Sequence, residues 1–281
     1  MADVKRIATR AGYGAALKEL GEIYENLVVF DADLADSTQT GVFRDAFPDR
    51  HFDCGIAEGN MMAAAAGAAS MGMVAFASSF AMFAVGRAYE QIRNSIGYTR
   101  LNVKVAASHG GISVGEDGAS HQCCEDFALM RSIPGMVVMC PADDVEARAA
   151  VKAAYSYQGP VYLRFGRLPV PVFHDEANYK FQIGKGEVLQ DGSDVAILAT
   201  GLLVNEAVEA GKALKEAGIS ARVINLCTIK PLDEALILKA ARECGLEDHL
   251  RGALRHRRSG RGSLLPAQRE VSHPCAPHRR E

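Results

Sequence analysis

An acid, a histidine and two glycines lie close together in the segment 115–122, shortly after the apolar run at residues 103–107. The glycines permit positive φ values and a close approach of the backbone to a ligand. Asp117 and His121 are four residues apart, so both side chains can converge on the hydroxyl or carbonyl groups of one small molecule. The same composition is common in ordinary turns, so this segment gains a functional meaning only from the rest of the chain.

Apolar runs and helical patterns predict the elements that must hold these residues. Buried strands are expected at 27–33, 51–54, 73–77, 103–107, 136–141 and 160–164. Helices are expected at 7–21, 61–71, 85–96 and 143–155, and the small residues of 61–71 predict a helix packed closely on all sides. Alternating strands and helices indicate a doubly wound, parallel α/β domain. A linker at 168–185 leads to a second βαβ unit at 195–225 and one more helix after Lys230.

Size and composition predict a cytoplasmic protein with reduced thiols. The 281 residues allow one large or two ordinary domains, and 48% hydrophobic residues suffice for a sizeable core. No run of 18 apolar residues is present, and the segment after Met1 has no apolar signal core, so neither a membrane span nor secretion is expected. The seven cysteines have irregular spacings without a CxxC pair, so no zinc site is predicted.

Several segments together resemble the C-terminal half of transketolase, over residues 10–245. The segment 115–122 is close to that family's own loop, and residues 32–37 are also transketolase-like. Gly-Ile-Ala-Glu at 55–58, followed by a small-residue helix, looks like the element of thiamine-diphosphate enzymes that holds the catalytic glutamate. Arg-Ala-Tyr-Glu-Gln at 87–91 leans instead towards the related deoxyxylulose-phosphate synthases. The resemblance implies a doubly wound pyrimidine-binding domain at 1–178 and a smaller, incomplete α/β transketolase C-terminal domain at 185–245.

The resemblance assigns four residues to thiamine diphosphate (thiamine pyrophosphate). Glu58 would hydrogen-bond N1′ of the pyrimidine and favour the tautomer that takes the proton from the thiazolium, a role that needs a carboxyl held away from bulk water. Phe80 and Phe83 would stack on the pyrimidine, and Asp33 would lie near the cofactor. On position alone, the favoured interpretation of Glu58 is an acid that stabilises a helix N-terminus, and that of both phenylalanines is core packing. Gly86 stands where transketolases carry a tyrosine, which reduces the aromatic pocket.

A grip on a sugar phosphate is also implied by the resemblance. Two arginine forks, a hydroxyl and an imidazole suit a phosphate dianion, and such side chains stand at the family's positions: Arg10, Ser37, His109 and Arg167. Arg164 is a rival for Arg167, because it lies three residues earlier. Asp117 and His121 would hold hydroxyl groups of the donor sugar, and His121 would join Glu58 as a catalytic residue.

Half of a thiamine-diphosphate site is not expected in this chain. The family binds the diphosphate through Mg²⁺, using a Gly-Asp-Gly motif and a later Asn, and neither residues 116–118 nor residues 190–192 fit that motif. The expected partner is a separate N-terminal subunit that carries Gly-Asp-Gly. Two such pairs would form a heterotetramer, a dimer of heterodimers. The chain is expected to be inactive alone, and neither nucleic acid nor a membrane is an expected partner.

The leading function implied by the resemblance is the transfer of a two-carbon ketol unit between sugar phosphates, as in the pentose phosphate pathway. A deoxyxylulose-phosphate synthase-like subunit or a 2-oxo-acid dehydrogenase β-type subunit is an alternative, although 2-oxo acids need no phosphate grip. A non-catalytic assembly subunit is a third alternative, since half of the cofactor site is missing.

The last segment, residues 246–281, differs in composition from the rest. It holds 8 Arg, no Lys and 4 Asp or Glu, a net charge of +4, whereas the preceding residues carry −7. With a suitable codon choice, residues 251–261 read from the second base give Glu-Glu-His-Ser-Val-Ile-Gly-Gly-Leu-Gly-Glu, which is the segment the family carries here. We therefore predict a frameshifted tail that begins near Gly245. A nucleic-acid-binding tail is the rival interpretation, but the segment lacks Lys and aromatic side chains for stacking on bases.

Overall fold

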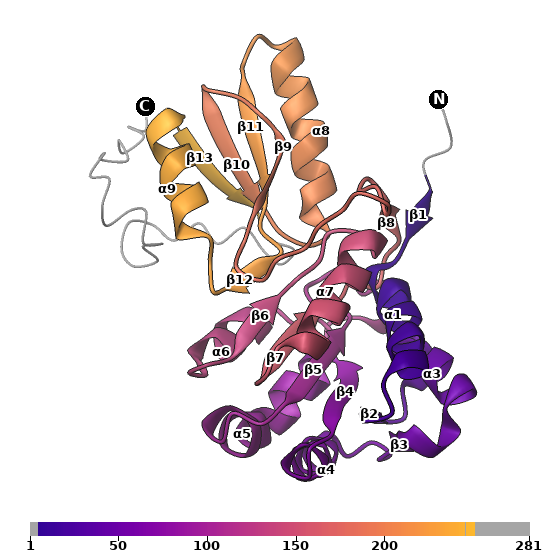
Figure 1. Ribbon diagram of the computed structural model, residues 1–281. Helices are drawn as coiled ribbons and strands as arrows, with labels where there is room; N and C mark the ends of the chain where they lie inside the picture. Colours follow the sequence, from indigo (N-terminus) through magenta and orange to yellow (C-terminus); the bar gives the residue numbers. More distant parts are fainter. Residues whose placement is uncertain (1–4, 245, 251–281) are drawn as a thin grey trace.

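The largest sheet positions most of the predicted site residues. The computed structural model describes residues 5–244 and 246–250, the last five as backbone only. Seven strands follow the order β12-β6-β7-β5-β4-β2-β3, and all pairs are parallel except β12 with β6 (Figure 1). Their bounds are β2 (Leu27–Asp31), β3 (His51–Asp53), β4 (Val74–Phe80), β5 (Val103–Ser108), β6 (Val137–Met139), β7 (Val161–Arg164) and β12 (Thr228–Lys230). The predicted doubly wound α/β fold is confirmed.

Helices cover both faces of this sheet and bury its alternating side chains in two separate cores. One core contains Tyr13, Phe76 and Leu163 and lies under α1 (Thr9–Ile23), α3 (Gly41–Ala46) and α7 (Asp144–Ser156). The other contains Met61 and Val105. It lies under α4 (Glu58–Ser70), α5 (Ala88–Gln91), α6 (Asp126–Ser132) and the π-helical turns η2 (Met82–Arg87) and η3 (Ile92–Tyr98). Strand β2 is buried along its whole length, as expected for a strand covered on both sides.

Helix α4 departs from the prediction that it packs on every side. Its Met61, Met62 and Ala65 are fully buried, but Ala63 and Gly67 on the opposite face are exposed. Small residues on all faces give the helix little amphipathic pattern, so the sequence did not separate the covered face from the open one. The chain therefore exposes small residues on the face of α4 that is opposite to the buried Glu58.

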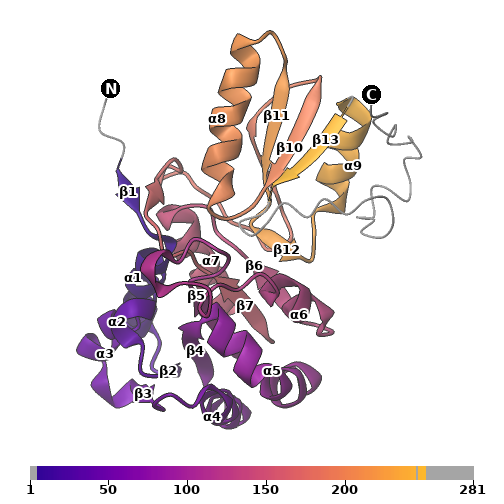
Figure 2. The same cartoon turned by 180° about the vertical axis from the view of Figure 1, so that it is seen from behind.

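A smaller four-stranded sheet, ordered β13-β10-β11-β9, forms the second unit (Figures 1 and 2). It comprises β9 (Glu187–Gln190), β10 (Val195–Ala199), β11 (Ala221–Asn225) and β13 (Leu246–Leu250), with helices α8 (Leu203–Glu216) and α9 (Glu234–Glu243). Strand β13 pairs in parallel with β10, so the first residues of the predicted frameshifted tail form a strand. Residues 251–281 lie outside the described residues, and the frameshift stays a prediction. Among the described helices, none has the length and apolarity needed to cross a membrane.

The two units are joined by a strand, a lysine and a histidine. Strand β12 comes from the second unit but pairs with β6 of the first. Lys230, at its end, donates from Nζ to the carbonyl oxygens of Arg131 and Ile133, at 2.8 and 2.6 Å. In the linker, β8 (Val170–Pro171) pairs with β1 (Arg6–Ile7), which returns the chain to its N-terminal region.

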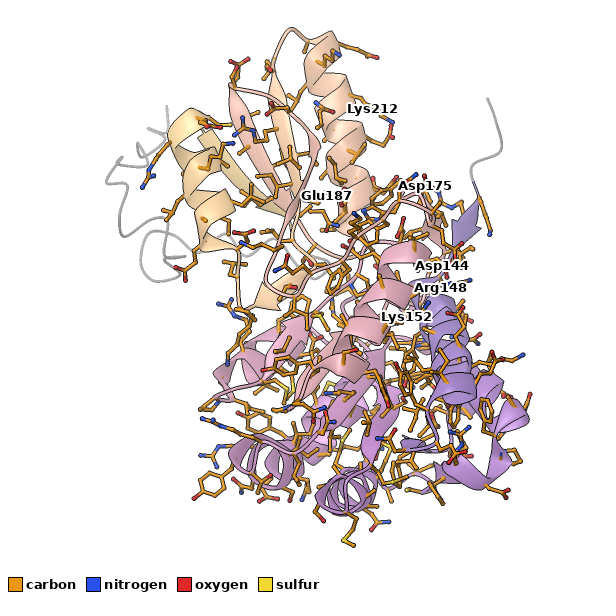
Figure 3. The ribbon with its side chains drawn as sticks, in the orientation of Figure 1. Asp144, Arg148, Lys152, Asp175, Glu187 and Lys212 are labelled. Atoms are coloured by element: carbon orange, nitrogen blue, oxygen red, sulfur yellow. The ribbon has the colours of Figure 1, made fainter. Side chains whose placement is uncertain are left out.

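His174 in the linker connects the first unit to the second through two carboxylates. Its Nδ1 lies 2.9 Å from Asp143, the residue that caps α7, and its Nε2 lies 2.9 Å from Glu187 at the start of β9. Figure 3 labels Glu187 where the second sheet meets the first unit, above the Asp144, Arg148 and Lys152 row of α7. Burial opposes the charged imidazole, but the hydrogen bonds to Asp143 and Glu187 outweigh it and raise the pKa of His174 to about 9.

Replacing this histidine should destabilise the chain in a pH-dependent manner. Since the folded pKa lies above the ordinary value of 6.5, charged His174 stabilises the fold fully below pH 6.5, and this contribution is lost as the pH rises through 9. We expect His174→Gln to lower the free energy of unfolding by about 2 kcal/mol at pH 6, with a difference that shrinks between pH 6.5 and 9 and is lost above pH 9. Urea unfolding at pH 6, 7.5 and 9.5 measures this. A difference that does not change with pH would contradict it.

Candidate active site

The predicted site residues lie on loops that follow the carboxyl ends of neighbouring parallel strands, where open α/β sheets bind ligands. Asp33 follows β2, Phe83 follows β4, His109 follows β5 and Arg167 follows β7. This edge of the sheet is turned towards the second unit, because Gly166 packs against Leu202 and the Thr200 hydroxyl donates to the carbonyl of Cys140 (Figure 2). Residues far apart in the sequence are thereby brought to one edge.

Two phenylalanines and two histidines form a cluster of rings at this edge. Phe80 stacks on His109 with ring centroids 3.8 Å apart, and on Phe83 with centroids 5.9 Å apart. His121 meets the ring of Phe83 edge-on at 4.9 Å, and its Nδ1 lies 3.0 Å from the Ser120 hydroxyl. The cluster combines flat apolar faces with imidazole groups that can exchange hydrogen bonds with a ligand.

Two arginines and one carboxylate extend the cluster towards α1. Asp117 Oδ2 lies 3.5 Å from Nε of Arg167 and 3.8 Å from Nε2 of His109. Arg10, on α1, donates from Nη1 to the carbonyl of Ser37 at 2.6 Å. Burial and the charge of Arg167 lower the pKa of Arg10. The Ser37 hydroxyl itself is not part of a described hydrogen bond, so the predicted role of its side chain stays a prediction.

His109 is held in an unusual conformation. Its φ is 58°, a left-handed value that is costly for residues with a side chain, and its ring is almost fully buried. Nδ1 lies 2.9 Å from the Ser108 hydroxyl. Burial, helped by the charge of Arg10, lowers the pKa of His109 to about 4, so the imidazole is neutral at pH 7. A neutral ring can donate and accept one hydrogen bond each without adding to the positive charge.

Glu58 is buried at the first position of α4, with 3% of its surface exposed. Both of its carboxylate oxygens accept hydrogen bonds from Nη1 of Arg87, at 3.0 and 3.3 Å. The guanidinium carbon of Arg87 lies 4.4 Å from the ring centre of Phe83, which links Glu58 to the ring cluster. Sequence analysis noted Arg87 only as part of a family-like segment and missed both contacts.

Asp33 lies next to this group rather than in it. Its backbone amide donates to Oδ1 of Asp53, and the amide of Gly55 donates to the same oxygen, at 3.0 and 2.8 Å. Asp53 therefore ties the loop after β2 to the loop that leads to Glu58. Sequence analysis did not single out Asp53, although its position at the end of a predicted strand was a usable signal. The Asp33 side chain is exposed, and its cofactor contact stays a prediction.

Arg164, the rival of Arg167, belongs to the core. It is 3% exposed, its Nε lies 2.8 Å from Oδ2 of the fully buried Asp126, and its guanidinium lies over the ring of Phe127. The Tyr162 hydroxyl donates to the same carboxylate oxygen. Arg164 is therefore a buried structural charge. Arg167 extends from the loop, where Glu116 Oε1 lies 2.5 Å from its Nη2.

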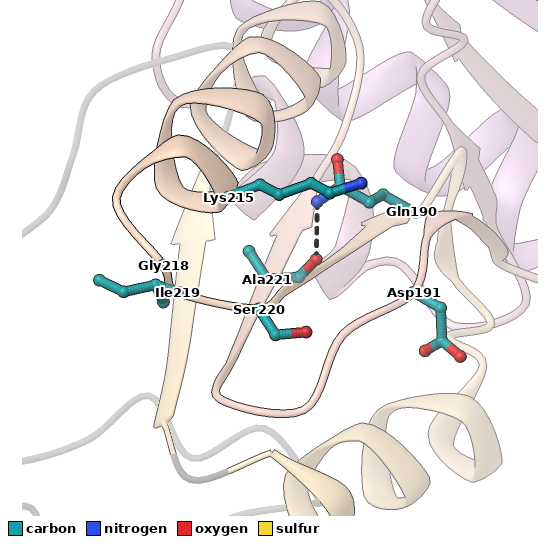
Figure 4. A pocket seen from close by; sticks show the side chains of 7 residues that line it. All are labelled: Gln190, Asp191, Lys215, Gly218, Ile219, Ser220 and Ala221. Atoms are coloured by element: carbon teal, nitrogen blue, oxygen red, sulfur yellow. Dashed lines mark hydrogen bonds between the residues drawn. The ribbon is translucent and has the colours of Figure 1, made fainter.

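The donor set fits one half of a thiamine-diphosphate site. A buried carboxylate beside an aromatic ring suits a flat heterocycle that offers N–H and ring nitrogen groups. For the metal half the described residues give no support, since no three His, Cys, Asp or Glu among them are placed to hold an ion. A cavity of about 400 Å³ lies in the second unit, away from this edge (Figure 4). None of the predicted site residues lines it. Its lining consists of Gln190, Asp191, Lys215, Gly218, Ile219, Ser220 and Ala221.

Known proteins match nearly the whole described chain. Residues 5–171 match the family "Transketolase, pyrimidine binding domain", and residues 184–249 match "Transketolase, C-terminal domain". A protein of Methanocaldococcus jannaschii assigned as a transketolase C-terminal section is 53% identical over 232 residues, 82% of this chain and 73% of that protein. A 6-deoxy-6-sulfo-D-fructose transketolase subunit of a Clostridium species is 41% identical over 84% of this chain and 73% of its own length.

A solved structure has the same fold. It is described as "Split gene transketolase, inactive beta4 tetramer", with a TM-score of 0.81 and 48% sequence identity, over 88% of this chain and 80% of that one.

The same substitution should destabilise the chain far more at Arg164 than at Arg167. Arg164→Met leaves the buried Asp126 without its charge partner and should lower the free energy of unfolding by about 3–5 kcal/mol. Arg167→Met, its matched control, removes a loop charge that pairs with the exposed Glu116 and should cost about 1 kcal/mol or less. Urea unfolding of both variants measures this, and equal losses would contradict the assignment.

Protonation of His109 should destabilise the fold in mild acid. Its folded pKa of about 4 lies below the ordinary 6.5, so between these values the unfolded chain binds a proton that the folded chain does not. Neutral His109 therefore carries no penalty above pH 6.5, and stability falls below it by up to about 1.4 kcal/mol per pH unit. We expect His109→Asn to show a shallower loss between pH 6.5 and 5 in urea unfolding. Parallel curves for the two proteins would rule out this explanation.

Proposed function

The chain belongs to the transketolase family, and from that premise we propose that it is the C-terminal subunit of a split transketolase that transfers a two-carbon ketol unit between sugar phosphates. One observation carries the proposal: an unbroken series of contacts runs from the buried Glu58 through the ring cluster to Asp117 and Arg167. A cofactor at one end and a substrate anion at the other would be held by a single edge of the sheet. The division into domains at 178–185 is part of the same proposal.

Each residue has a task that its surroundings support. Thiamine diphosphate, when bound, supplies the nucleophilic carbon that the two-carbon unit joins. Glu58 holds a proton at N1′ of the pyrimidine, away from bulk water, while Phe80 and Phe83 orient the ring. His121 and the neutral His109 hold hydroxyl and carbonyl oxygens of the substrate, since each can donate a hydrogen bond next to the ring cluster.

The anionic end of the substrate would bind between Arg10 and Arg167. Paired guanidinium groups favour a phosphate dianion, and the neutral His109 adds a hydrogen bond without another charge to desolvate. Asp117, which faces Arg167 and His109, would accept hydrogen bonds from sugar hydroxyls. A sulfonate-bearing sugar is a second candidate, because the Clostridium relative is named for 6-deoxy-6-sulfo-D-fructose and a sulfonate fits the same forks.

A partner subunit is needed for the rest of the site. The described residues offer no metal-binding group. The face of α4 opposite to Glu58 exposes the small residues Ala63 and Gly67, which suits close packing against another subunit. We propose that an N-terminal subunit with the Gly-Asp-Gly motif supplies the Mg²⁺ and diphosphate contacts, and that two such pairs associate. The name "inactive beta4 tetramer" of the related structure supports inactivity of such a subunit without its partner.

The assay is ketol transfer from xylulose 5-phosphate to ribose 5-phosphate with thiamine diphosphate and Mg²⁺. The chain alone should be inactive, and the mixture with the N-terminal subunit should be active. Parallel reactions with 6-deoxy-6-sulfofructose and with pyruvate as donors separate the sulfo-sugar and deoxyxylulose-phosphate synthase-like alternatives. Turnover of pyruvate alone would overturn the ketol-transfer proposal.

Glu58→Gln should reduce turnover of the assembled complex about 10²–10⁴-fold, because the amide cannot hold the proton at N1′. Glu90→Gln is the matched control: Glu90 is exposed on α5, accepts a hydrogen bond from Asn94 and should leave turnover unchanged. Steady-state rates of the two complexes measure the effect. Full activity of Glu58→Gln in a complex that assembles would instead support a non-catalytic assembly subunit.

A further inference from the structure

Arg87 makes the two contacts that the proposed function assigns to the pyrimidine ring. Its Nη1 donates to both oxygens of Glu58, and its planar guanidinium lies over the face of Phe83, 4.4 Å from the ring centre. Phe83 and Arg87 are the second and last residues of the π-helical turn η2, so one short segment carries both the stacking ring and the group stacked on it.

We propose that Arg87 occupies the pyrimidine position in the free subunit and is displaced when the cofactor binds. This inference rests on the proposed function, because it takes Glu58 and Phe83 as the pyrimidine contacts. A guanidinium is flat, donates N–H groups in its own plane and stacks on aromatic rings, and these are the properties that the same two residues would select in a pyrimidine. Binding of the cofactor therefore competes with an internal group.

The exposure of the Arg87 side chain allows it to separate from Glu58. The Arg87 side chain is 52% exposed, whereas Glu58 is 3% exposed, so the guanidinium returns to water without crossing the core. A half-exposed ion pair is weak compared with a buried one, which allows a ligand to replace it.

If Arg87 is displaced by the cofactor, removing Arg87 should increase the affinity for the cofactor, whereas structural damage would decrease it. If Arg87 were a permanent partner that Glu58 requires, its removal would weaken cofactor binding. If Arg87 competes with the pyrimidine, its removal tightens binding by the inverse of the fraction of molecules with the position open. For an arginine in place about nine-tenths of the time, the dissociation constant falls about tenfold.

The experiment is calorimetric titration of thiamine diphosphate, with Mg²⁺, into the complex of this chain with the N-terminal subunit. We expect about tenfold tighter binding for Arg87→Met and a smaller gain for Arg87→Lys, because an ammonium still pairs with Glu58 but does not stack flat on Phe83. Arg93→Met is the matched control, since Arg93 is an exposed arginine on η3 that donates to Asn94, and it should leave affinity unchanged.

The outcomes are distinct. Equal affinities of the wild type and Arg87→Met, with both complexes folded by circular dichroism, would overturn the displacement proposal alone, and so would weaker binding by both Arg87 variants. If Arg87→Met does not fold, Arg87→Lys carries the test through the same ratio. Binding by Arg87→Met where the wild type shows none would support displacement strongly. Failure of every complex to bind the cofactor would overturn the proposed function and this inference together.

Discussion

The parallel alignment of β2, β4, β5 and β7 is the constraint on which the site depends. Because these strands run in the same direction, their carboxyl ends meet at one edge, and residues separated by more than a hundred positions become neighbours. The strands themselves are apolar and buried, so the chemistry is confined to the first few residues after each strand. His109 shows how tight this arrangement is, since it adopts a left-handed backbone conformation one residue after β5. Such strain persists only where the surrounding fold fixes it.

Charges at this edge are divided between fixed and exchangeable partners. The Arg164–Asp126 pair is buried beneath the loops and joined by the Tyr162 hydroxyl, so it holds the floor of the site in one arrangement. Arg167 and Arg87 extend from the surface and pair with carboxylates that a ligand could replace, Glu116 for the first and Glu58 for the second. The fixed pair differs from the others because both of its partners are buried. Separating buried partners costs more free energy than separating a guanidinium that is already in contact with water.

Most of the fold was readable from the sequence, because apolar runs of five or six residues separated by helical patterns have few other interpretations. Helix α6 and strand β12 are among the elements that were missed. The first begins with the polar run that follows Cys124, and the second is too short to give a pattern. Family resemblance also named the residues that form the ring cluster, and it favoured Arg167 over Arg164 for the anion without a local signal to separate the two. The contact of Glu58 with Arg87 spans 29 positions and leaves no local signal, so only the folded chain reveals it.

Strand β12 makes the sheet of the first unit depend on the second unit. It is contributed by the second unit, yet it pairs with β6 at the end of the larger sheet. Cutting the chain in the linker at 178–185 would therefore leave the backbone amides and carbonyls of β6 without a neighbour, and an unpaired, apolar edge of this kind recruits strands from other molecules. The pyrimidine-binding half of this chain is thus poorly suited to exist as an isolated domain. By contributing β12, the second unit covers this edge of the larger sheet.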